Sequence, residues 1–123
     1  MNDTFPVAQA LPASDPLDGE PELRKELAGL FLESCEQSLS TIQQLISDRK
    51  ASELRKEAHT LKGSIGVFRD QAAFNAAFQM EMIGSHAAWD RAEAACETLR
   101  AETRRLAAVL ARFIHQEVPC TLS

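Results

Sequence analysis

The sequence predicts an all-α protein, specifically an antiparallel up-down-up-down four-helix bundle with an N-terminal tail or short extra helix. Three observations favour this class. Apolar residues recur at three- and four-residue spacing in four successive segments. Only a few residues separate these segments, so consecutive helices are expected to run antiparallel. The 123 residues include no tyrosine and few β-branched runs, which disfavours a sheet.

The first helix is predicted over about residues 21–46. Residues 18–20, Asp-Gly-Glu, precede Pro21 as a helix-start signal, since proline is tolerated in the first turn. Residues 1–17 contain three prolines and are expected to form a tail, with a short helical turn near residues 7–11. The apolar positions of the predicted helix are Leu23, Leu27, Leu30, Phe31, Cys35, Leu39, Ile42, Leu45 and Ile46.

The second helix is expected to follow a break at Ser47 and Asp48, which can cap it, and to run to about Phe68. Its apolar stripe, which is expected to face the core, consists of Leu54, Ala58, Leu61, Ile65 and Phe68.

The third helix is expected to begin after Asp70 as its N-cap and to end at Gly84 and Ser85. Its core side is predicted to include Phe74, Ala77, Phe78 and Met82.

The fourth helix has the longest periodic signal in the chain. Its predicted core positions are Trp89, Ala92, Cys96, Leu99, Thr103, Leu106, Leu110 and Phe113. The bundle is therefore expected over residues 18–117, with a C-terminal tail at 118–123. His86 and His115 have no predicted role. His115 is expected near the helix end, where its protonated form would interact favourably with the helix dipole.

Composition excludes several classes of function. The net charge of −5 disfavours nucleic acid as a partner. No apolar stretch of about 18 residues or secretory signal is present, so neither membrane insertion nor export is expected. The three cysteines lack C-x-x-C spacing, so the sequence predicts neither a disulfide framework nor a metal site. We expect a single domain, monomeric and cytoplasmic, with reduced thiols.

The segment around His59 carries the strongest indication of chemistry. His59, Lys62 and Gly63 stand at positions i, i+3 and i+4, which share one face of a helix. His59 lies about 140° round the helix from the centre of the apolar stripe, on the same side as Arg55 and Gly66. A nucleophilic ring, an exposed lysine and bare backbone together suit a phosphoryl group that is presented to a partner.

The two glycines of this segment need an explanation, because each costs a helix interior about 1 kcal/mol relative to alanine. One interpretation is that Gly63 and Gly66 leave room for the close approach of a partner. The alternative is that they allow a neighbouring helix to pack.

Residues 58–64, Ala-His-Thr-Leu-Lys-Gly-Ser, continued by Ile-Gly-Val-Phe, resemble the signature of histidine-containing phosphotransfer (HPt) domains of bacterial multistep phosphorelays. The resemblance extends from about residue 23 to 114. It implies that His59 is the phosphoacceptor, that Lys62 and Gly63 match family positions, and that Glu81 orients the ring from the next helix. Arg69 and Asp70 stand where many members have glycine-alanine, which leaves the ending of that helix open.

The resemblance implies a phosphorelay intermediate that takes a phosphoryl group onto His59 from a receiver-domain aspartate or a kinase, then passes it to another receiver domain. Lys62 would supply positive charge to the phosphoryl oxygens, while Arg55, Gly63 and Gly66 would meet the partner. If Glu81 accepts a hydrogen bond from Nδ1–H of His59, Nε2 is left free to react.

The sequence contains neither a nucleotide-binding loop nor an acidic cluster for Mg²⁺. We therefore expect no autonomous ATP-dependent kinase activity, no resident cofactor, and Mg²⁺ only in the partner receiver domain. Expected partners are a response-regulator receiver domain, a hybrid histidine kinase, or both. The alternative function is a non-catalytic helical docking module that regulates a two-component partner. A metal- or cofactor-binding bundle is disfavoured, because Glu-x-x-His pairs are missing.

Overall fold

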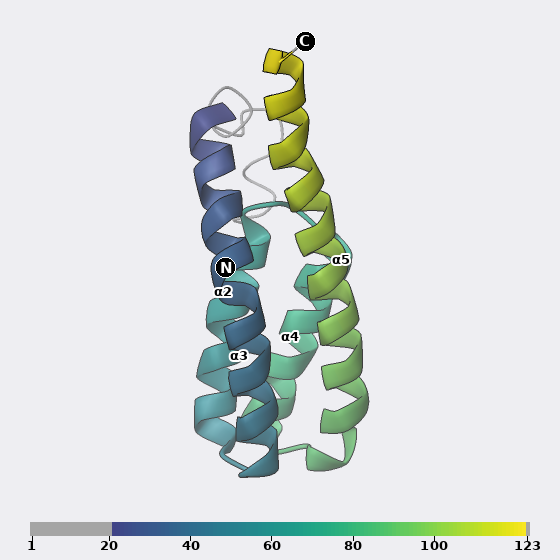
Figure 1. Ribbon diagram of the computed structural model, residues 1–123. Helices are drawn as coiled ribbons and strands as arrows, with labels where there is room; N and C mark the ends of the chain where they lie inside the picture. Colours follow the sequence, from purple (N-terminus) through teal and green to yellow (C-terminus); the bar gives the residue numbers. More distant parts are fainter. Residues whose placement is uncertain (1–20, 123) are drawn as a thin grey trace.

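The structure, a computed structural model, describes the backbone of residues 21–122 and the side chains of residues 22–115. Within this range the chain forms four helices joined by short loops: α2 (Pro21–Ser47), α3 (Ala51–Gly66), α4 (Gln71–His86) and α5 (Trp89–Leu122). Figure 1 shows that consecutive helices run antiparallel, which confirms the predicted up-down-up-down bundle. The tail predicted over residues 1–17 and the start signal at 18–20 lie outside the described residues.

The four helices differ in length, and this shapes the molecule. α3 and α4 have 16 residues each, whereas α2 has 27 and α5 has 34. As a result, α2 and α5 extend together beyond the other two helices at the end that carries the C-terminus (Figure 1). The compact four-helix part of the bundle is therefore the part that contains His59.

The core follows the stripes predicted for α2, α3 and α5 over most of their length. The buried residues of these three helices are Ala28, Phe31, Cys35, Leu39, Ile42, Leu54, Ala58, Leu61, Ile65, Ala92, Cys96, Leu99, Leu106 and Leu110, together with Lys62 and Thr103. Leu23 and Leu30, which belong to the predicted stripe of α2, are exposed instead. Both belong to the N-terminal half of α2, a helix that with α5 is longer than α3 and α4.

The core face predicted for α4 was partly wrong. Ala77 is buried as expected, but the other core residues of α4 are Ala73, Ala76, Met80, Ile83 and Gly84. Phe74 and Met82 are only half-buried, and Phe78 is 36% exposed. The alanines and Gly84 on the inner face let α4 approach α3 closely, and the phenylalanines stay only partly buried.

Gly84 is the closest point of this contact and does not end α4, as the sequence had suggested. The helix continues to His86, and Ala87 follows in the left-handed conformation. A Cβ built at Gly84 would lie 2.6 Å from the Arg55 backbone nitrogen and 3.0 Å from the Ala51 carbonyl oxygen. Glycine is therefore required here for helix packing.

Each loop between helices contains one non-glycine residue with positive φ: Arg49 at 56°, Arg69 at 60° and Ala87 at 51°. After α2, the Lys50 N–H donates to the Leu45 carbonyl at 3.0 Å, the six-to-one bond of a Schellman motif. After α3, Arg69 takes the left-handed conformation that glycine usually takes at a helix end. This answers the question of how α3 ends with arginine in place of glycine.

Ser47 and Asp48 do not cap α3, contrary to the prediction. Ser47 is the last residue of α2, and the Asp48 carboxylate accepts a hydrogen bond from Gln44 Nε2 at 3.2 Å. The N-cap of α3 is Lys50, which makes no side-chain capping bond. The Schellman motif uses up the residues between the two helices, so Ser47 and Asp48 lie too early in the chain to cap α3.

Asp70 is the N-cap of α4, as predicted. Its Oδ1 accepts a hydrogen bond from the Ala73 N–H at 3.0 Å and another from Arg105 Nη2 at 2.6 Å. The same carboxylate therefore starts α4 and ties the α3–α4 loop to α5.

The C-terminal helix is longer than expected. α5 runs to Leu122, so the backbone of residues 118–122, expected as a tail, continues the helix. His115 consequently lies inside α5, and the favourable interaction with a helix end predicted for it does not apply.

Candidate functional site

His59 presents a ring with one nitrogen engaged and the other free. Its side chain is 59% exposed on α3, and Nδ1 lies 3.0 Å from Oε2 of Glu81 on α4. An ionised carboxylate can only accept hydrogen bonds, so in the neutral ring Nδ1 carries the proton. The lone pair is then on Nε2, which is the nitrogen available for reaction.

Glu81 connects His59 to a second basic group. It is only 15% exposed, and its Oε1 lies 2.8 Å from Nζ of Lys62. Burial alone would raise the pKa of the carboxyl, but hydrogen bonds from Lys62 and then from His59 hold the pKa of Glu81 below its ordinary value. Glu81 is therefore an anion at neutral pH, which fixes its role as acceptor for the His59 Nδ1–H.

Lys62 is buried, and the prediction that its charge is exposed was wrong. Its side chain is 8% exposed, and Nζ lies 5.8 Å from the ring centroid of Phe74 and 5.2 Å from that of Phe78. The two rings come from α4, one and two turns before Glu81. Lys62 is thus enclosed by aromatic surface and paired with a carboxylate, rather than open to the solvent beside His59.

The level at which Glu81 meets His59 follows from the packing of Gly84 on Arg55. His59 lies four residues after Arg55 on α3, and Glu81 lies three residues before Gly84 on the antiparallel α4. At about 1.5 Å of rise per residue, the step from Arg55 to His59 covers about 6 Å along α3, and the step from Gly84 back to Glu81 covers about 4.5 Å along α4. Because the two helices are antiparallel, both steps go in the same direction. The close contact at Gly84 therefore places Glu81 beside the ring.

The predicted partner-facing residues differ in their surroundings. Arg55 is exposed, and a Cβ built at Gly63 would have no heavy atom within 4 Å, so that position faces open space. Gly66 is half-buried, and its Cβ would lie 3.6 Å from the Phe74 ring. The absence of a side chain at Gly84 is therefore explained by the packing of α4 on α3. At Gly66 a side chain would contact the Phe74 ring, and at Gly63 no neighbouring helix is close enough to require glycine.

Comparison with known families finds a match over most of the chain. The Hpt domain family matches residues 26–111, a span that contains His59, Lys62 and Glu81. The chain belongs to the Hpt domain family. The resemblance noted in the sequence is thereby confirmed, and it assigns this Hpt domain to phosphotransfer in two-component and phosphorelay signalling. No curated protein and no solved structure matches the chain significantly.

Sequence reasoning missed three residues that build the site of this Hpt domain. Phe74 and Phe78 enclose Lys62, and Gly84 sets the register of α4. A signal for the aromatic pair was present, because two phenylalanines at i and i+4 are followed three residues later by Glu81, on the same side of the helix. Those positions had been assigned to the core instead.

Two further features concern the described residues only. No helix among them combines the length and apolar character needed to cross a membrane. Within the same part of the chain, no group of three or more histidine, cysteine, aspartate or glutamate side chains is arranged to hold a metal ion.

Proposed function

We propose that this Hpt domain is a phosphorelay intermediate in which His59 Nε2 receives a phosphoryl group from the aspartyl phosphate of a receiver domain, or from a kinase. It then passes the group to another receiver domain. The observation that carries the proposal is the 3.0 Å contact between Nδ1 and Glu81, which leaves Nε2 free on an exposed ring.

The transfer step needs no proton movement. The Nε2 lone pair attacks phosphorus, the N–P bond forms, and the P–O bond to the aspartyl carboxyl breaks so that the carboxylate leaves with the electron pair. The ring becomes a phosphoimidazolium whose Nδ1–H still donates to Glu81. The carboxylate therefore stabilises positive charge that appears on the ring during the reaction.

Lys62 assists through Glu81 in this proposal. Phosphoryl transfer passes through a loose transition state, so catalysis depends mainly on positioning and charge. By holding Glu81 ionised, Lys62 maintains the hydrogen bond that selects the reactive nitrogen of His59. Lys62 is thus a positioning residue.

The partner provides the remaining machinery. We infer that a receiver domain brings the Mg²⁺ and its acidic ligands, and that it approaches over Gly63 and the adjoining surface of Arg55 and Gly66. We further propose that the protein acts as a monomer in the bacterial cytoplasm, where a response regulator or hybrid histidine kinase would meet it, without a cofactor of its own.

The decisive experiment compares His59→Gln with wild type after incubation with a phosphorylated receiver domain. Wild type should acquire acid-labile, base-stable phosphate, and the variant should acquire none, because glutamine lacks the nucleophilic ring. The thermal midpoint should remain near that of wild type, since the side chain is exposed.

His86→Gln is the matched control. His86 is an exposed histidine of α4 whose Nδ1 lies 3.0 Å from the Met82 carbonyl oxygen, and it should keep full phosphorylation. The competing function, a non-catalytic docking module, predicts receiver binding without any phosphate on wild type. That result would reject the phosphorelay proposal.

A further inference from the structure

The phosphoryl group on His59 needs counter-charge that Lys62 does not offer. Lys62 Nζ is paired with Glu81 at 2.8 Å and lies over the rings of Phe74 and Phe78. The phosphoryl group would stand on Nε2, the outward nitrogen of an exposed ring, on the opposite side of the imidazole from Glu81. The cations that meet it should therefore be exposed and lie on the surface of α3.

Helix geometry indicates where those cations must be. Side chains on an α-helix lean toward its N-terminus, so a residue covers the surface of the turn that precedes it. The His59 ring thus leans over the turn that contains Arg55 and Lys56, which stand at i−4 and i−3. At about 100° per residue, Arg55 and Lys56 lie about 40° and 60° to either side of His59.

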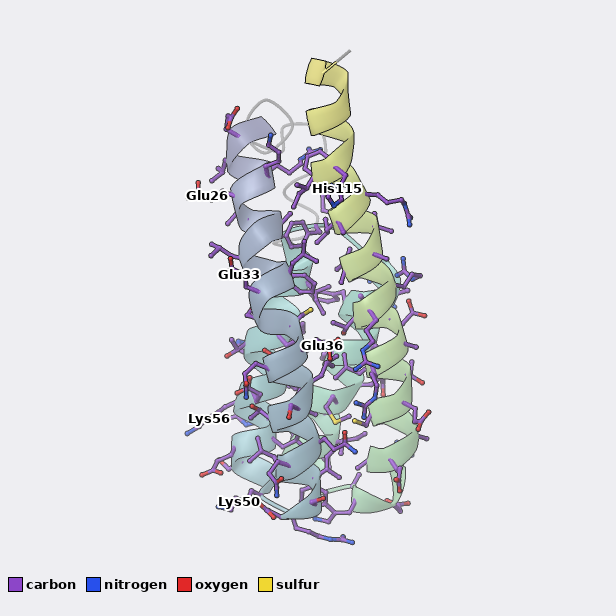
Figure 2. The ribbon with its side chains drawn as sticks, in the orientation of Figure 1. Glu26, Glu33, Glu36, Lys50, Lys56 and His115 are labelled. Carbon is purple, nitrogen blue, oxygen red and sulfur yellow. The ribbon has the colours of Figure 1, made fainter. Side chains whose placement is uncertain are left out.

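Both side chains are available for a ligand. Arg55 and Lys56 are exposed, and neither makes an ion pair or hydrogen bond with any residue in the described part of the chain. Figure 2 shows Lys56 extending outward from α3, away from the bundle. The nearest acid on this turn, Glu57, lies about 160° round the helix from His59 and does not oppose them.

We propose that Arg55 and Lys56 form an anion subsite that binds the oxygens of the phosphoryl group once it is attached to His59 Nε2. The inference rests on the proposed function and deepens it. It separates two tasks: Lys62 holds Glu81 ionised beneath the ring, and the Arg55–Lys56 subsite stabilises the phosphorylated product above it.

The subsite can be tested on the isolated protein, without a receiver domain. Phosphoramidate serves as the donor: Nε2 attacks phosphorus, the N–P bond forms, the P–N bond of the zwitterionic reagent breaks, and ammonia leaves. The last ionisation of the phosphoryl group on His59 is then followed by ³¹P NMR against pH in wild type, Arg55→Gln, Lys56→Gln and the double variant.

Each removed cation should raise the pKa of the phosphoryl group by about 0.5 pH unit, the effect of a unit charge about 6 Å away in water. The double variant should show about twice that shift. Raising the salt concentration to about 1 M should abolish the differences, because the Debye length falls to about 3 Å. The other charges beside the ring, Glu81 and Lys62, are unchanged in all these proteins.

Lys50→Gln is the matched control, because it removes one exposed lysine at the N-cap of α3, about 180° round the helix from His59. Its titration should coincide with that of wild type. Equal shifts in Lys50→Gln and Lys56→Gln, or no shift in any variant, would overturn the subsite while leaving the proposed function intact. Failure of wild-type His59 to accept phosphate at all would overturn the proposed function itself.

Discussion

In the proposed function, Glu81 on α4 selects the reactive nitrogen of His59, and Lys62, one turn from the histidine, keeps Glu81 ionised. The chain of contacts runs from Nδ1 of His59 to Oε2 of Glu81 and from Oε1 of Glu81 to Nζ of Lys62. Since His59 and Lys62 share one carboxylate, a change at Lys62 should alter both the stability of the protein and the hydrogen bond that fixes the tautomer of the ring.

Lys62→Ala should therefore cost about 2–3 kcal/mol of unfolding free energy, because it breaks a largely buried ion pair and removes the side chain that packs on the rings of Phe74 and Phe78. Lys62→Met keeps the apolar stem in place and should cost less. Both variants should raise the pKa of Glu81, slow phosphotransfer and weaken the preference for the Nδ1–H tautomer. Urea unfolding and ¹⁵N spectra of the imidazole measure these effects. A Lys62→Ala variant within about 0.5 kcal/mol of wild type would contradict the burial of this residue.

Among the helices, the pair α3 and α4 carries the site, and Gly84 determines how closely they approach. Gly84→Ala should destabilise the protein by about 1–3 kcal/mol, since the added methyl would meet backbone atoms of Arg55 and Ala51 that have no room to move. It should also slow phosphotransfer, because the shift of α4 moves Glu81 away from the ring. Thermal unfolding and the transfer rate test both parts.

Gly29→Ala is the control for that substitution. Gly29 lies inside α2, and a Cβ there would meet no heavy atom within 4 Å. The same change should stabilise the protein by up to about 1 kcal/mol, through helix propensity alone. If both alanine variants changed stability in the same direction, close packing at Gly84 would not be the cause.

The junction of α3, α4 and α5 at Asp70 gives a pH-dependent contribution to stability. Burial opposes ionisation there, but hydrogen bonds from Arg105 and the Ala73 N–H hold the pKa of Asp70 below its ordinary value of 3.8. Because the folded pKa lies below the unfolded one, the contribution is present above about pH 3.8 and is lost as the pH falls through the folded value.

Asp70→Asn retains an N-cap but loses the ion pair with Arg105. The variant should be less stable than wild type at pH 7, and the two stabilities should converge as the pH falls below 3.8. The convergence is followed by measuring the urea unfolding midpoints of both proteins from about pH 2 to about pH 7. A difference that stays constant across the series would mean that the charge of Asp70 is not what stabilises the junction.

For the molecule as a whole, the sequence predicted the bundle, the His59 face and Asp70 as a cap, because periodicity and capping are local properties. It failed where two helices meet. The inner face of α4 combines alanines and Gly84 with Met80 and Ile83, while its phenylalanines are only partly buried. The apolar pattern alone cannot distinguish this arrangement from one with the phenylalanines in the core. Nor could it show that Lys62 is buried, since the residues that cover it come from α4.

In the proposed function, Gly63 is a position where the protein gives up helix stability so that a partner can approach. Gly63 lies one turn after His59 on the exposed face of α3, with open space around its missing side chain. Gly63→Leu should raise the unfolding free energy by about 0.5–1 kcal/mol through helix propensity. The same side chain should stand in the path of an approaching receiver domain and reduce the transfer rate by roughly tenfold or more, the equivalent of about 1.4 kcal/mol of lost association.

Gly29→Leu places the same side chain on α2, where it should add helix stability without affecting transfer. Stability and transfer measured together on both variants separate the two effects. If Gly63 keeps the face open for a partner, Gly63→Leu should raise the unfolding free energy and lower the transfer rate, whereas Gly29→Leu should leave the transfer rate unchanged. If Gly63→Leu transferred phosphate at the wild-type rate, the receiver would dock on a different surface. If the Gly63→Leu variant were less stable than wild type, Gly63 would have to contact a neighbouring helix, which the packing of α3 and α4 does not show.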